Sequence, residues 1–164
     1  MPVTSSGKAV VTLPADDQIL ITREFDAPAA LVWRALTEPD LVKRWWAGER
    51  GVVTSAEIDL RVGGTWRYVM TGTHEGASFE VAFHGEYHEL VEHEKIVSTE
   101  VFEGMPDASS FNTMTLVEAD GKTTLQTLVQ HSSKEHRDGH INSGMEVGMQ
   151  EAFDRLENVA RSLM

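Results

Sequence analysis

The chain has 164 residues, no cysteine and a formal net charge of −12 at pH 7, from 26 acidic and 14 basic residues. This length suits one domain, and the lack of cysteine excludes disulfide and thiol chemistry. The negative charge repels phosphate backbones and anionic lipids, and no apolar run is long enough to span a membrane. We expect a cytoplasmic protein without nucleic-acid or membrane partners, made of a tail or edge strand (1–17) and a single domain (18–164).

The first part of this domain predicts a strand and two short helices. Residues Ile19–Phe25 alternate in polarity and are rich in β-branched side chains, which is typical of a strand. Asp26 suits the N-cap of a following helix, with Pro28 in its first turn. Pro39 ends that helix, and Leu41–Trp46 predicts a second one.

The middle of the chain changes to a polarity period of two residues, which predicts strands joined by a turn around Gly63–Gly64. A two-residue turn would place Trp66 on the same face as Asp59. A three-residue loop would instead place Trp66 beside Ile58 and Leu60. We prefer the three-residue loop because it gathers the apolar side chains on one face.

Four more strands and a long helix complete the prediction. One long strand carries Phe79 to Tyr87, and the next spans Lys95 to Phe102. Two final strands flank the turn signal Asp120–Gly121. From His140 to Leu163, apolar residues recur at helical spacing, which predicts one amphipathic helix about 36 Å long.

Several motifs in this order resemble the START-like (SRPBCC, helix-grip) superfamily, in the group similar to the activator of the heat-shock chaperone ATPase. They are TREFDAP (22–28) with Val32–Trp33, LTEPDL (36–41), RWW (44–46), EIDLRVGGTW (57–66), GEY (85–87) and the helix from Gly148 to Leu163. The resemblance implies an α+β fold, in which a seven-stranded antiparallel sheet wraps around the C-terminal helix. Two short helices would roof a cavity between them.

The cavity implied by this resemblance is the candidate site, and we expect it to bind a ligand. Trp45 and Trp46 would form an aromatic gate at its mouth or would plug the core. The family often carries Trp where Met149 stands, so the cavity is expected to be wider here. The full set of expected ligand-binding residues is Trp45, Trp46, Trp66, Tyr68, Met70, Phe83, Tyr87, Met114, Asn142, Met145, Met149 and Phe153.

We expect non-covalent binding of a small hydrophobic or amphipathic molecule rather than catalysis. One alternative is a hydrolase or cyclase acting on an aromatic or polyketide-like substrate, with Glu86, Glu100 or His84 as the acid–base group. Another is a stress-related or co-chaperone-like interaction module, which could work as a homodimer. The eukaryotic activator holds its main chaperone-binding region in a separate domain, which argues against that role.

The histidines do not predict a metal site. His131, His136 and His140 are the most suggestive group because two of them have helical i, i+4 spacing. Gly139 interrupts that segment. We therefore expect no metal and no other cofactor.

Overall fold

Strands and helices follow one another in the predicted order, with a short strand near the N-terminus and an additional helix before the last one. The structure is a computed structural model and describes residues 8–164. Its strands are β1 (Val10–Thr12), β2 (Gln18–Phe25), β3 (Gly51–Ile58), β4 (Thr65–His74), β5 (Ala77–Val91), β6 (Lys95–Phe102), β7 (Ser110–Ala119) and β8 (Lys122–His131). Its helices are α1 (Ala29–Thr37), α2 (Pro39–Trp45), α3 (Lys134–Asn142) and α4 (Met145–Ser162).

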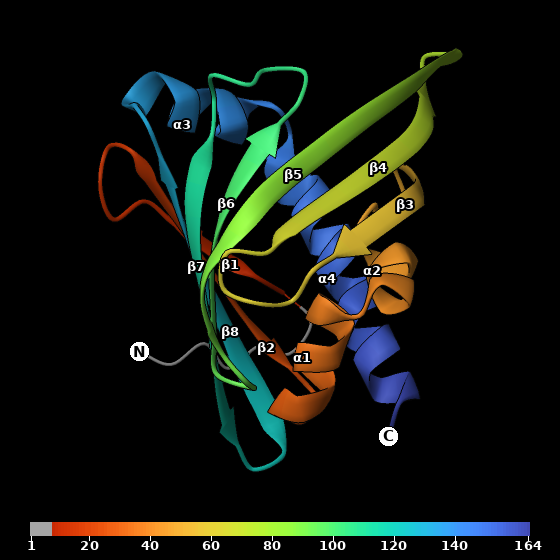
Figure 1. The fold of residues 1–164 in the computed structure, drawn as a ribbon, viewed down its shortest axis with the longest axis vertical. Coiled ribbons are helices and arrows are strands. Elements are labelled where there is room, and N and C mark those ends of the chain that lie inside the picture. Colours follow the sequence, from red (N-terminus) through yellow and green to blue (C-terminus); the bar gives the residue numbers. More distant parts are fainter. Residues whose placement is uncertain (1–7) are drawn as a thin grey trace.

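All of these strands form one antiparallel sheet in the order β1-β2-β8-β7-β6-β5-β4-β3. The resemblance implied seven strands, and the eighth is β1, an edge strand that pairs with β2. It lies in the segment 1–17, of which residues 1–7 are outside the described part of the chain. The sheet curves, and α4 lies along its concave side with α1 and α2 beside it (Figure 1). This is the α+β helix-grip architecture that the resemblance implied.

The predicted helix His140–Leu163 is divided into two helices, α3 and α4. Gly144 has a φ of +82°, which interrupts the helical hydrogen-bond ladder between them. Helix α4 alone has 18 residues and is therefore about 27 Å long. The Arg50 guanidinium packs over this junction: Nη2 donates to the Gly144 carbonyl at 2.7 Å, and a Cβ at Gly148 would lie 2.9 Å from Cζ. Both glycines therefore allow close packing against Arg50, not against the sheet.

Asp26 does not cap α1, contrary to the prediction. Its backbone N–H donates to Glu157 of α4, and its carboxylate accepts from Arg161. The N–H of Ala29, in the first turn of α1, donates instead to the side chain of Glu118 on β7 at 2.7 Å. A carboxylate from a distant hairpin thus satisfies one of the free N–H groups at this helix start.

The connection between β3 and β4 is longer than either predicted loop. Ile58 pairs with Trp66, so residues 59–64 join the two strands. Ile58 and Trp66 share one face, as predicted. Leu60 lies in the connection and is 41% exposed, so its predicted place on that face is wrong.

The connection between β7 and β8 has the predicted two-residue turn. Ala119 pairs with Lys122, and both central residues have positive φ, 55° at Asp120 and 77° at Gly121. This conformation matches the right-handed twist of the flanking strands. No helix within residues 8–164 has the length and apolar composition that crossing a membrane requires.

Candidate functional site

Alternate side chains of the sheet point toward α4, and we call this side the inner face. Ladder partners lie on the same face, so the pairs Tyr68–Phe83, Tyr87–Ser98 and Asn112–Ser98 extend one inner face across β4 to β7. Nine of the twelve predicted ligand-binding residues belong either to this face or to the facing side of α4. These residues are Trp66, Tyr68, Met70, Phe83, Tyr87, Met114, Met145, Met149 and Phe153.

Aromatic rings form one end of the inner face. The ring of Trp46 lies edge-on to Tyr68 and Phe83, with centroids 5.3 and 4.9 Å apart. The Trp66 ring is 4.7 Å from that of Tyr68. Gly85 makes room for this indole, because a Cβ there would lie 2.5 Å from Trp66 Nε1.

The two adjacent tryptophans of α2 have different environments. Trp45 is 6% exposed, and its Nε1 donates to the Ala35 carbonyl at 2.7 Å, so its ring fills the core. Trp46 remains partly exposed beside the aromatic rings of the inner face. Trp45 therefore fills the core, whereas Trp46 keeps the partial exposure that a gate residue would need.

Methionines lie on both walls of the space between the sheet and α4. Met114 comes from the inner face, and Met145 and Met149 come from the first half of α4. All three pack at the edge of the core and keep partial exposure. The close backbone contacts of α4 are concentrated on α1 and α2 rather than on any strand. Long, flexible side chains therefore occupy the space between the first half of α4 and the sheet.

Three other predicted residues lie outside the groups of aromatic rings and methionines described above. Phe153 is buried, with its ring edge-on to Phe25 at 5.6 Å, and belongs to the core beneath α4. Met70 lies farther along β4, paired with Val53 and Val81. Asn142 is exposed at the end of α3.

A row of polar side chains crosses the inner face; the sequence singled out Glu100 but missed Asn112 and Thr127. Glu100 Oε1 accepts a long hydrogen bond of 3.4 Å from Asn112 Nδ2. Asn112 Oδ1 and the hydroxyl of Thr127 are buried and have no hydrogen-bond partner among the described residues. Thr127 is 5% exposed and lies on β8, diagonal to Asn112 on the neighbouring strand. A buried polar atom without a partner is costly, so this row marks a place where another molecule could supply one.

The surroundings of this row alter the acidity of its members. Burial raises the pKa of Glu100, and the hydrogen bond from Asn112 opposes that rise only in part. Burial, with Tyr87 and Glu100 nearby, also raises the pKa of Tyr68 well above its usual value. Of the three acid–base candidates, only Glu100 faces α4; Glu86 and His84 are exposed on the opposite side of the sheet.

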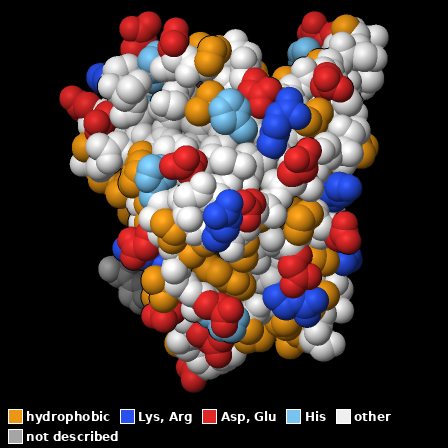
Figure 2. All heavy atoms as spheres, viewed as in Figure 1, with side chains coloured by type: hydrophobic (Ala, Val, Ile, Leu, Met, Phe, Trp, Pro, Cys, Tyr) orange, Lys and Arg blue, Asp and Glu red, His pale blue; other side chains and the backbone are white. Residues whose placement is uncertain are grey.

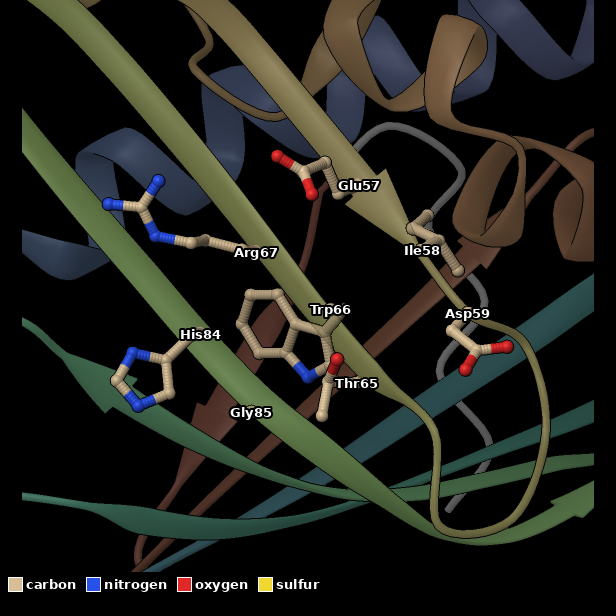
Figure 3. Close-up of a pocket in the computed structure, with 8 residues that line it drawn as sticks. All are labelled: Glu57, Ile58, Asp59, Thr65, Trp66, Arg67, His84 and Gly85. Atoms are coloured by element: carbon tan, nitrogen blue, oxygen red, sulfur yellow. The ribbon is translucent and has the colours of Figure 1, made fainter.

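A hollow of about 490 Å³ lies on the outer face of the sheet, on the side away from α4 (Figure 3). Arg67, Glu57 and His84 project there from neighbouring strands. Glu103 accepts hydrogen bonds from Arg67 at 2.9 and 3.0 Å and is 2.9 Å from His84 Nδ1. Acidic and basic side chains are interspersed over this face (Figure 2). Because Arg67 and His84 are exposed and already pair with Glu103, we place the candidate site on the inner face.

The histidines suggested for a metal do not come together as a group. His131 Nε2 is 2.9 Å from His140 Nδ1, whereas His136 Nδ1 is 2.7 Å from the hydroxyl of Ser132. Within residues 8–164, no three His, Asp or Glu side chains are arranged to hold a metal ion.

Comparison with known proteins agrees with this geometry. The profile of the family described as "Activator of Hsp90 ATPase homolog 1-like protein" matches residues 26–161. The chain belongs to this family. A comparison with curated proteins gives no match.

Solved structures share the fold of this family member. A protein from Rhodobacter sphaeroides has a TM-score of 0.85 at 23% identity, over 94% of this chain and 99% of that one. Protein Ms6760 from Mycobacterium smegmatis has a TM-score of 0.82 at 25% identity, over 99% and 100%. DynU16, from the dynemicin biosynthetic locus, has a TM-score of 0.64 at 20% identity, over 88% of this chain and 47% of that one.

Proposed function

We propose that this protein binds a small amphipathic molecule between the inner face of the sheet and the first half of α4. The observation that carries the proposal is that Met114, Met145 and Met149 stand on opposite walls and all keep partial exposure. Side chains that filled this space completely would be buried. Trp46, beside Tyr68 and Phe83, would cover one end of the ligand.

Burial of apolar surface would supply most of the affinity. Removing ~300 Å² of ligand surface from water is worth about 7 kcal/mol before the entropy cost of capture. The flexible methionine side chains can adjust to ligands of irregular shape. DynU16 comes from a biosynthetic locus, and its likeness in fold is compatible with a small-molecule role here.

Native mass spectrometry of the protein purified from its own host tests this proposal. We expect an added mass of about 200–500 Da that disappears under denaturing conditions. Met149→Trp places a large ring in the space beneath α4 and should remove the added mass. Val147→Trp adds the same ring at a position that is 63% exposed and should leave it in place. No added mass on the unaltered chain, or equal loss in both variants, would count against the proposal.

A second candidate function uses the same site as an enzyme. Glu100 is the observation that favours it, because burial raises the pKa of this carboxyl and so favours the protonated form that a general acid uses. The substrate class would be the aromatic or polyketide-like one named above. Turnover of a bound compound by the unaltered protein, but not by Glu100→Gln, would establish this candidate in place of simple binding.

A further inference from the structure

The polar row on the inner face has more hydrogen-bond acceptors than donors. The amide of Asn112 already directs Nδ2 toward Glu100, which leaves Asn112 Oδ1 with no donor among the described residues. Glu100 accepts one long hydrogen bond, of 3.4 Å. The hydroxyl of Thr127, diagonal to Asn112, is also without a partner.

We infer that the bound molecule carries a hydrogen-bond donor, a hydroxyl or an ammonium group, at its inner end, where Glu100 and Asn112 accept from it. This inference rests on the proposed binding function and specifies the chemical class of the ligand. The donor end lies against the polar row, and the apolar body lies among the methionines and aromatic rings. A ligand with a carboxylate at this end is disfavoured because it would face the Glu100 carboxyl and the unpaired Asn112 oxygen.

The ionisation of Glu100 agrees with such a ligand. Burial raises the pKa of this carboxyl, and no cationic side chain contributes to its shift. A hydrogen-bond donor of the ligand that reaches Glu100 therefore has little competition from donors of the protein. A neutral hydroxyl can form a hydrogen bond with the protonated or the ionised carboxyl. An ammonium group would add a cation that pairs with the ionised form.

Three naphthalene probes that differ only in the polar group test the inference. They are 2-naphthol, which donates, 2-methoxynaphthalene, which only accepts, and 2-naphthoate, which is an anion. Binding is measured by isothermal titration calorimetry at pH 7. We expect 2-naphthol to bind ~10-fold or more tightly than each of the other two, because a site with unpaired acceptors discriminates against ligands that lack the donor. A fourth probe, 2-naphthylmethylamine, shows whether ammonium is preferred over hydroxyl.

Variants assign the preference to the polar row. In Glu100→Leu, the advantage of 2-naphthol over 2-methoxynaphthalene should fall to within ~2-fold. In Glu100→Gln, 2-naphthoate should gain affinity because the Gln amide supplies N–H donors for a carboxylate. Glu86→Leu removes an exposed carboxylate from the outer face and should change none of the ratios. Thermal melting confirms that each variant is folded before its affinities are compared.

The outcomes separate this inference from the proposed function. Equal binding of all three probes, or tighter binding of 2-naphthoate, overturns the donor preference and leaves a ligand site in place. A preference for 2-naphthol that persists in Glu100→Leu also overturns the assignment. Failure of every probe to bind overturns the proposed function itself.

Discussion

Arg23 on β2 and Asp154 on α4 form an ion pair with 3.0 Å between Nη1 and Oδ1, although 131 positions separate them in the sequence. The side chain of Arg23 is fully buried, and its Nη2 also pairs with Glu157 at 3.2 Å. The guanidinium lies 4.8 Å from the ring centroid of Phe25. A buried cation therefore joins the second half of α4 to the sheet, while the methionine-bearing first half lacks such a link.

Arg23→Ala should lower the free energy of unfolding by about 2–4 kcal/mol, because it removes the buried cation and leaves its two carboxylates without it. Urea denaturation measures the change. Arg34→Ala breaks an exposed ion pair with Glu38 and should cost less than ~1 kcal/mol. Similar costs for the two variants would show that the buried pair has no special role.

The same substitution at two glycines should have opposite effects. Gly144 has a φ of +82°, so Gly144→Ala should destabilise the fold by about 1 kcal/mol or more. Gly139 lies within α3 with open space where a Cβ would be added. Gly139→Ala should therefore stabilise the fold by up to ~1 kcal/mol. Chemical denaturation of both variants tests this prediction. A change in stability of the same sign in both variants would contradict it.

Two buried threonines of β8 allow a matched comparison. The hydroxyl of Thr123 donates to the Ala27 carbonyl at 2.7 Å, so Thr123→Val should cost about 1–2 kcal/mol. The hydroxyl of Thr127 has no partner among the described residues, so Thr127→Val should be neutral or stabilising. Melting curves of the protein without ligand measure both. A large loss in Thr127→Val would reveal an internal role for that hydroxyl.

Stability should fall as the pH is lowered from about 6.5 toward 4. Burial, with His140, His136 and Arg137 nearby, lowers the pKa of His131 to about 4, and Asp17 only partly opposes this. The unfolded chain then binds more protons than the folded one in this range, so the stabilisation is complete above about pH 6.5 and is lost as the pH falls. Burial lowers the pKa of His140 as well.

Melting temperatures at pH 7 and pH 5 measure this dependence. In His131→Gln the difference between the two temperatures should shrink, because one group that must be protonated is gone. His74→Gln is the control, because His74 is exposed at the end of β4. An unchanged difference in His131→Gln would contradict the assignment to His131.

The order of the strands and helices could be predicted because the spacing of apolar residues in the sequence reflects which side of each element is buried. The division of the last helix could not. Apolar residues continue at helical spacing from Ile141 through Met145, so the sequence pattern does not stop at Gly144. The interruption coincides with a contact from Arg50, which is distant in the sequence.

Asn112 and Thr127 of the polar row were missed for a related reason. On β7, Phe111 and Val117 point outward and are 41% and 65% exposed, whereas Asn112 points inward. Apolar side chains thus lie on both faces of β7, so the alternation does not assign Asn112 to the inner face, and only pairing with β6 and β8 places it beside Glu100 and Thr127. Trp46, Met114 and Met149 could be placed next to the core because apolar spacing marks the buried side of a strand or a helix.

The position of β2 in the sheet has a consequence for folding. This strand pairs with β8, and Phe25 meets Thr123, which is synthesised about 100 residues later. The nascent β2 therefore has no long partner strand until nearly the whole sheet has left the ribosome. Such non-local pairing raises contact order and slows folding. During that interval the apolar residues of β2 are unpaired and exposed, so chaperones can bind them or they can aggregate.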